Sequence, residues 1–257
     1  MERYLEGRLA IVTGGFAGIG KAIAIALAER GATIAVGARR QPEAAIAELE
    51  AVSDSLFCDK LDVADVESVA AYVTALEARH GPADILVNAA GVTAHEYVCG
   101  HDEQSWLDVI DINLSGPFRM IRACLPKMIE RRWGRIINIG STAAHTATAD
   151  HAAYCASKSG LLGLNRAVAL EGAPHGVSSV TISPTWVQTE MMDASMNTQA
   201  RNAGISVEEE YARVIAQQPQ QRLVQPRELG ALAAFLCRDE ALGITMEDIQ
   251  LNAAALW

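Results

Sequence analysis

The sequence predicts an α/β protein whose core is a doubly wound parallel sheet. Short apolar runs alternate with helical patterns along the chain, which is the order typical of βαβ units. The runs are apolar throughout, as expected for parallel strands that helices cover on both faces. The chain has 257 residues, 50% of them hydrophobic, and no internal repeat or Pro/Gly-rich linker divides it. We therefore expect a single domain over residues 1–257.

Seven apolar runs are the predicted strands, and the amphipathic segments between them are the predicted crossover helices. In chain order the runs are residues 9–13, 33–36, 55–58, 84–87, 135–140, 177–183 and 248–251. The crossovers are expected to be right-handed. The alternation is interrupted once, over residues 184–226, which are rich in Met, Gln and Glu. A long segment of this kind in a compact domain is typical of a binding insert, so we expect substrate contacts there.

Composition excludes several classes of protein. A net charge of −10, from 31 acidic and 21 basic residues, disfavours a nucleic acid or an acidic membrane surface as partner. Five cysteines without a CxxC pair indicate reduced thiols and a cytoplasmic protein. The charged first nine residues do not form a signal peptide, and no apolar run is long enough to span a membrane.

A glycine-rich run, TGGFAGIG, follows the first predicted strand and begins the first predicted helix. Gly14, Gly18 and Gly20 permit a tight turn, close approach of the backbone to a pyrophosphate, and close packing of helix on strand. The free N–H groups at the start of the helix would bind the phosphates. The spacing is GxxxGxG instead of GxGxxG, and the alternative is an ordinary strand-to-helix turn.

The end of the second predicted strand bears on the choice of dinucleotide. Folds of this kind usually have an acidic residue there that binds the adenosine ribose of NAD, but this chain has Ala38. Arg39 and Arg40 follow, and they would suit the 2′-phosphate of NADP. NADP is therefore the preferred cofactor, with NAD left open. The alternative is that both arginines are solvated surface charges.

Four polar residues form the predicted catalytic group. Tyr154 and Lys158 lie four residues apart in a helical run, YCASK, which places both side chains on one face. Ser141 ends the strand-like run RIINIGS, and Asn113 lies in DINLSG after the fourth strand.

With these motifs the chain resembles the short-chain dehydrogenase/reductase family, whose fold is Rossmann-type. The motifs occur in the family's order over nearly the whole chain: TGGFAGIG, LDVADV with Asp62, NAAG over residues 88–91, the Asn113 region, Ser141, YCASK and the residues 184–189. The resemblance implies a catalytic tetrad of Asn113, Ser141, Tyr154 and Lys158. It also implies that Asp62 meets the adenine and that Asn88, Val187 and Thr189 hold the cofactor. The cofactor-binding residues expected in all are Gly14, Gly18, Ile19, Gly20, Arg39, Asp62, Asn88, Gly91, Tyr154, Lys158, Val187 and Thr189.

The activity that this resemblance implies is NADP(H)-dependent interconversion of a secondary alcohol and a ketone. Tyr154 would be the general acid/base, Ser141 would bind the substrate oxygen, and Asn113 would hold a water in the proton path. A free phenol has a pKa near 10, so this work at neutral pH calls for a depressed pKa, which Lys158 and the oxidised nicotinamide could supply. The alternatives are an NAD-dependent enzyme of the same family that oxidises a 3-hydroxy acid or a polyol, and a catalytically silent nucleotide-binding regulator.

The C-terminal half is similar to 3-hydroxybutyrate dehydrogenases and polyketide ketoreductases, but it departs from the family at two places. Thr185, in SPTW, replaces a common glycine, and Asn252 with Ala253 stand where many relatives have an acidic residue and paired glycines. The candidate substrate contacts are Thr93, Ala143, His151, Trp186, Met191 and Met192. His151 is alternatively a surface histidine, and the two methionines are alternatively core residues.

Metal binding is not predicted, because His95, Cys99 and His101 have no standard zinc spacing. The resemblance implies a homotetramer in which the helix bearing Tyr154 and the helix after Asn88 pack against their copies. The apolar end of the chain, Ala255, Leu256 and Trp257, is expected between subunits or folded onto its own domain.

Overall fold

A seven-stranded sheet lies at the centre of the computed structural model, which describes residues 2–53 and 55–255. The strands are β1 (Leu9–Thr13), β2 (Thr33–Ala38), β3 (Leu56–Lys60), β4 (Ile85–Asn88), β5 (Gly134–Ile139), β6 (Val177–Pro184) and β7 (Asp248–Leu251). Their order is β3-β2-β1-β4-β5-β6-β7, and every neighbouring pair is parallel. The order changes direction between β1 and β4, where ligands bind in sheets of this kind.

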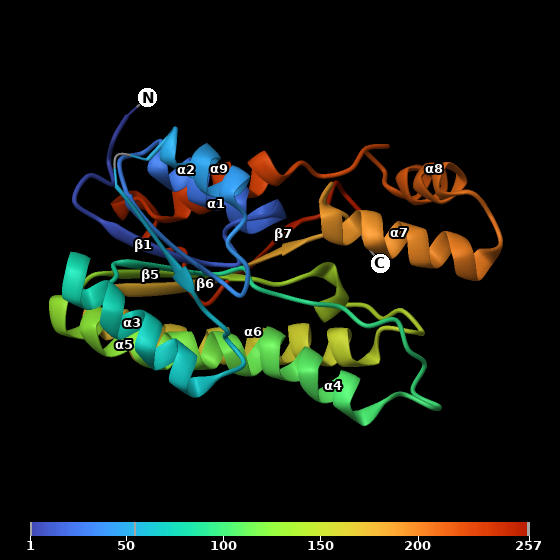
Figure 1. Cartoon of the computed structure of the whole chain (residues 1–257), viewed down its shortest axis with the longest axis horizontal. Coiled ribbons are helices and arrows are strands. Elements are labelled where there is room, and N and C mark those ends of the chain that lie inside the picture. The colour runs from blue at the N-terminus through green and yellow to red at the C-terminus, as the bar shows by residue number, and fades with distance from the viewer. Residues whose placement is uncertain (1, 54, 256–257) are drawn as a thin grey trace.

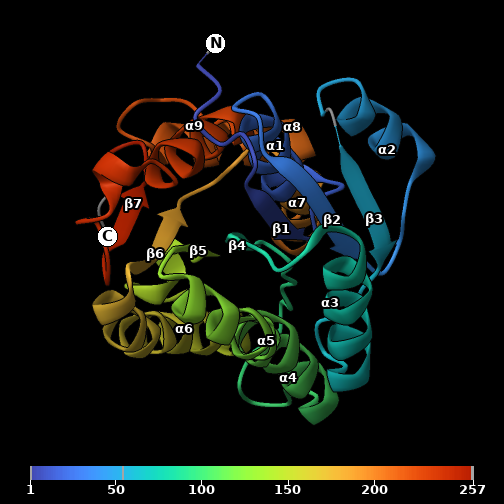
Figure 2. The ribbon, with the colours of Figure 1, turned by 90° about the vertical axis from the view of Figure 1, so that its left-hand side faces the viewer.

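Helices cover both faces of the sheet (Figure 2). They are α1 (Gly18–Ala28), α2 (Glu43–Glu50), α3 (Val66–His80), α4 (Glu103–Ile110), α5 (Gly116–Arg131), α6 (Ala152–Gly172), α7 (Glu190–Ala203), α8 (Val207–Gln217) and α9 (Pro226–Leu236). Successive residues of β1 explain the three layers: Ala10 and Val12 join the core under α1, α2 and α9, while Leu9 and Ile11 join the core over α3, α5 and α6. Side chains of a strand alternate between faces, so a wholly apolar strand needs helices on both.

The predicted fold class is confirmed, and so are all seven predicted strands. β1 and β7 have the predicted bounds, whereas β2 is two residues longer than predicted. It continues because Gly37 pairs with Thr13 and Ala38 pairs with Lys60 in the neighbouring strands. These pairings depend on the neighbours and not on the apolar pattern of β2 itself.

Residues 184–226 contain α7 and α8, which extend beyond the carboxyl end of β6 (Figure 1). The two helices share a small apolar core of their own, formed by Met192, Met196, Val214 and Leu223. Trp186 and Tyr211 pack against this core. The segment is therefore an ordered helical pair at the edge of the sheet where the strands end.

The two departures from the family pattern have different structural consequences. The Thr185 side chain is buried, and its hydroxyl donates to Gln218 Oε1 at 3.3 Å, which ties β6 to the end of α8. Ala253 and Ala254 have φ values of 50° and 62°, a region that glycine adopts far more easily than alanine. The backbone directly after β7 is therefore strained at these two alanines.

The described end of the chain folds onto its own domain. Ala255 is 4% exposed, and its N–H donates to the Asn252 carbonyl. Leu256 and Trp257, which were expected between subunits, lie outside the described residues. Among residues 2–53 and 55–255, no helix combines the length and apolar character needed to cross a membrane.

Candidate active site

The glycine-rich loop forms a closely packed cradle between β1 and α1. Gly14 has a φ of 66°, and a Cβ atom there would lie 3.0 Å from the Ala90 Cα. A Cβ atom at Gly20 would lie 2.5 Å from the Gly14 carbonyl oxygen. Ala17, at the start of α1, provides no side-chain cap, so the first N–H groups of the helix remain available to a ligand. This geometry fits a bound pyrophosphate.

The loop after β4 is held against this cradle. The Thr13 hydroxyl accepts the N–H groups of Ala89 and Ala90, each at 3.1 Å. Asn88 donates its amide to Asn138 Oδ1 at 2.9 Å, while its own Oδ1 is buried without a partner among the described residues. A buried acceptor of this kind fits a hydrogen-bonding ligand such as a nicotinamide ribose.

The segment after β6 closes the other side of the cradle. A hollow of about 370 Å³ lies between α1 and the start of α7, and both Gly18 and Thr189 line it. A Cβ atom at Gly18 would lie 3.1 Å from the Thr189 methyl group. Thr189 also begins α7, since its hydroxyl accepts the Met192 N–H. Val187 is buried in the core beside this segment and forms a β-bridge with Val224.

Arg39 and Arg40 are exposed directly after β2, and neither has an ion-pair partner among the described residues. Two free guanidinium groups at the edge of the cradle can bind a phosphate. The Asp62 carboxylate accepts the Ala64 N–H at 3.0 Å within the loop after β3. This turn fixes the loop in front of the carboxyl end of the sheet.

Tyr154, Ser141 and Lys158 lie together at the ends of β5 and α6. The Tyr154 hydroxyl lies beside Ser141, whose Oγ accepts the Ala143 N–H at 3.1 Å. Lys158 is 5% exposed, its Nζ lies 5.6 Å from the centre of the Tyr154 ring, and it donates to the Ile139 carbonyl at 2.7 Å. The predicted spacing on one helix face is confirmed, because both residues lie within α6.

Asn113 occupies a π-helical turn, residues 111–115, between α4 and α5. Its amide nitrogen donates to the Val92 carbonyl at 2.9 Å and to Ser157 Oγ at 3.1 Å, and its oxygen accepts the Val92 N–H at 2.9 Å. Both amide hydrogens are thus used by protein groups, and only the second lone pair of Oδ1 remains for a water. Gly91 is next to it, since a Cβ atom there would lie 3.3 Å from Asn113 Oδ1.

The proposed chemistry calls for a depressed pKa of Tyr154, but the chain by itself raises this pKa. Burial raises the pKa of Tyr154, and the hydrogen bond with Ser141 opposes this rise without cancelling it. Burial also lowers the pKa of Lys158 to about 8, so the ammonium form is itself disfavoured. The chain alone therefore does not depress the pKa of Tyr154. Any depression has to come from a positive charge that binds beside the ring.

The candidate substrate residues fall into two groups. Thr93, Ala143 and His151 adjoin the cluster around Tyr154: Thr93 follows Val92, Ala143 donates to Ser141, and the His151 ring lies 6.3 Å from the Tyr154 ring. The other three belong to the insert. Trp186 and Met192 pack in its small core, while Met191 is 45% exposed.

His151 is not a surface histidine. Its side chain is 13% exposed and its Nδ1 lies 2.6 Å from Asp150 Oδ1. His95 lies against the same carboxylate, whereas Cys99 is exposed and His101 pairs with Glu96. Sequence reasoning missed Asp150 and the role of His95, although Asp150 next to His151 directly before YCASK was an available signal.

Comparison with known proteins agrees with this geometry. Residues 8–200 match the short chain dehydrogenase family, so the chain belongs to that family. It is an oxidoreductase that acts on a secondary alcohol or a ketone with a nicotinamide dinucleotide.

Similar proteins include a 3-oxoacyl reductase and a hydroxybutyrate dehydrogenase. The 3-oxoacyl-(acyl-carrier-protein) reductase FabG of Vibrio cholerae is 38% identical over 248 residues, which cover 96% of this chain and 97% of that protein. The D-beta-hydroxybutyrate dehydrogenase of Cupriavidus necator is 37% identical over 243 residues, which cover 92% of this chain and 93% of that protein. A crystal structure of an actinorhodin polyketide ketoreductase variant with NADPH has a TM-score of 0.94 and 32% identity, and covers 99% of both chains.

Proposed function

We propose that this chain reduces a ketone with NADPH, or oxidises the corresponding secondary alcohol, with Tyr154 as the general acid/base. The observation that carries the proposal is the cluster of Tyr154, Ser141 and Lys158 beside a glycine cradle at the carboxyl edge of the sheet. The bound dinucleotide supplies the hydride. The protein has to place the ketone, stabilise the oxygen as negative charge develops on it, and deliver a proton.

Each residue of the cluster has a separate task. Tyr154 donates the proton to the substrate oxygen, and Ser141, which lies beside the Tyr154 hydroxyl, binds the same oxygen. Lys158, whose Nζ lies 5.6 Å from the centre of the Tyr154 ring, holds the cofactor ribose. Asn113 is a positioning residue, because its amide fixes Val92 to the helix that carries Tyr154.

Replacement of Tyr154 by phenylalanine tests this assignment. The ring remains but the proton donor is lost, so single-turnover hydride transfer should fall by about 100-fold to 10,000-fold while NADPH still binds. Tyr97→Phe is the matched control, since Tyr97 is 67% exposed. A loss below tenfold in Tyr154→Phe would remove this residue from the chemistry.

NADP is the proposed cofactor because Arg39 and Arg40 are exposed and unpaired among the described residues and no acidic residue ends β2. Ala38→Asp combined with Arg39→Leu should move the preference toward NAD, since a carboxylate binds the ribose hydroxyls and repels a 2′-phosphate. The measurement is kcat/KM with NADPH and with NADH. A wild-type protein that prefers NADH would contradict the assignment and favour the NAD-dependent alternative.

We further infer that residues 184–226 bind the substrate and that the protein is a cytoplasmic homotetramer. Exposed apolar side chains on α4, α5 and α6 support the homotetramer, because they would be buried between subunits. They are Trp106, Leu107, Phe118 and Leu170. Light scattering on Phe118→Glu should show smaller particles than wild type. An unchanged mass would exclude α5 from the interface.

A further inference from the structure

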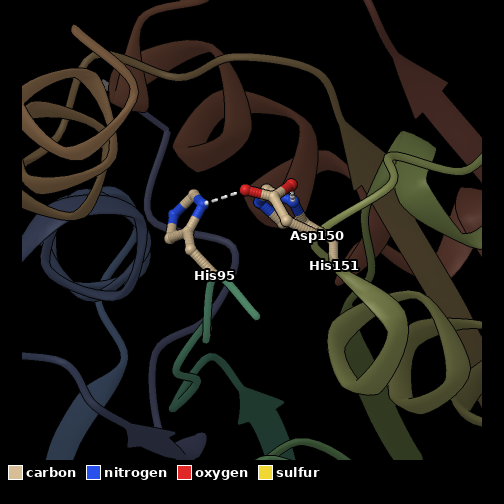
Figure 3. Close-up of side chains that lie close together, drawn as sticks. All are labelled: His95, Asp150 and His151. Carbon is tan, nitrogen blue, oxygen red and sulfur yellow. Dashed lines mark hydrogen bonds and ion pairs between the residues drawn. The ribbon is translucent and has the colours of Figure 1, made fainter. Parts of the chain in front are cut away.

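Three side chains from two distant segments, His95, Asp150 and His151, lie close together (Figure 3). The His151 ring contacts the Tyr154 ring edge to face. His95 belongs to the loop after β4, whereas Asp150 and His151 directly precede α6. The backbone holds the segments together, because the Glu96 N–H donates to the Asp150 carbonyl at 2.9 Å and Glu96 forms a β-bridge with His151. The cluster is thus built into the fold and does not depend on flexible side chains alone.

We propose that His95, Asp150 and His151 form a binding site for a divalent transition metal, with zinc as the best fit. One ligand atom from each residue lies within 4.8 Å of the other two. His95 Nδ1 is 3.3 Å from Asp150 Oδ2, and His151 Nδ1 is 2.6 Å from Asp150 Oδ1. Tetrahedral zinc with bonds of about 2.0 to 2.2 Å separates neighbouring ligand atoms by about 3.4 Å. Small side-chain rotations would bring the three atoms onto one ion.

The composition of the cluster selects the class of metal. Two imidazoles and one carboxylate suit zinc and its neighbours in the first transition row, whereas magnesium and calcium prefer oxygen ligands alone. Three protein ligands also leave one position for a water or a substrate oxygen. The His151 ring lies 6.3 Å from the Tyr154 ring, so an ion here would border the proposed substrate site.

The three side chains are held close together and largely away from water. The centres of the His95 and His151 rings lie 4.3 Å apart. The side chains of His95, Asp150 and His151 are 11%, 17% and 13% exposed, so little solvent competes with them.

A fourth residue orients the first imidazole. The Nε2 atom of His95 lies 3.3 Å from the hydroxyl of Ser195, which is buried in α7. If Nε2 carries the hydrogen and donates it to Ser195, the lone pair of Nδ1 points at the carboxylate. Metal-binding histidines typically have such a partner on the other ring nitrogen. The contact also links the insert to the cluster.

Titration of the full-length, chelator-treated protein with Co²⁺, followed by visible absorption, tests the proposal without reference to turnover. We expect one saturable ion per chain with tetrahedral bands, displaced by Zn²⁺. His95→Ala or His151→Ala should weaken binding at least tenfold, and Ser195→Ala should weaken it by about 10-fold to 100-fold. His145→Ala is the matched control, because His145 pairs with Asp248 at a different place. All proteins carry Cys99→Ser, since that exposed thiol could bind cobalt independently.

A second measurement does not depend on the folding of the variants. In the protein with both histidines intact, Co²⁺ should shift the imidazole proton resonances of His95 and His151, with the other histidines much less affected. Absence of saturable binding would overturn the proposal. Binding that survives His95→Ala together with His151→Ala, or that shifts other histidines instead, would overturn it as well.

Discussion

The burial of Lys158 predicts an unusual dependence of stability on pH, which Lys158→Met should abolish. In the folded chain the pKa of Lys158 is lowered from 10.5 to about 8 because the ammonium is cut off from water. A difference of about 2.5 between the two pKa values corresponds to about 3.4 kcal/mol, by which the folded chain is destabilised when Lys158 is charged. The side chain is 5% exposed, so solvent screens little of this cost.

The sign follows from where the proton is bound. Between pH 8 and pH 10.5 the unfolded chain holds the proton on Lys158 and the folded chain releases it. Stability contributed by this residue therefore rises with pH in that window, by about 2 kcal/mol between pH 7 and pH 9.5. Burial raises the pKa of Cys124 and of Cys237 to about 12, which has the opposite effect on stability at high pH. Subtracting the variant from the wild type removes that contribution, because both proteins contain the same thiols.

Urea unfolding of wild type and Lys158→Met at several pH values is the assay. Methionine fills a similar volume in α6 and loses the hydrogen bond to Ile139, a cost that does not change with pH. The stability of the wild type relative to Lys158→Met should therefore improve by about 2 kcal/mol from pH 7 to pH 9.5. A difference that stays constant over this range would refute the argument that Lys158 is desolvated in the folded chain.

Three further substitutions test local features. Ala254→Gly should stabilise the fold by about 0.5 to 1 kcal/mol in urea unfolding, because the residue is exposed and has a φ of 62°. A loss of stability would show that the backbone at Ala254 is not strained. Gly20→Ala should destabilise the fold by about 1 to 3 kcal/mol and weaken NADPH binding in a fluorescence titration, since the new Cβ would lie 2.5 Å from the Gly14 oxygen. Unchanged NADPH binding would show that the glycine-rich loop is not the phosphate-binding site. Asp65→Ala should cost about 1 kcal/mol by thermal unfolding, because the carboxylate caps α3 through the Glu67 N–H at 2.9 Å; an unchanged Tm would show that the cap contributes nothing.

The sequence by itself determined the fold class, the seven strands and the group around Tyr154. These depend on short-range patterns: apolar runs specify buried strands, glycines at fixed spacing specify the turn after β1, and four residues along a helix place Tyr154 and Lys158 on one face. The exact end of β2 was not predicted, because it depends on pairing with β1 and β3.

Only the tertiary structure decided which polar groups meet and how strongly they are desolvated. His95 and Asp150 are 55 positions apart and Ser195 is 100 positions from His95, so no local spacing marks them as neighbours. The pKa of Tyr154 rises because of burial by the whole fold. Contacts of this kind are fixed by how β4, α6 and α7 are placed around the sheet. Desolvation is a property of everything packed around a group, and a linear pattern does not contain it.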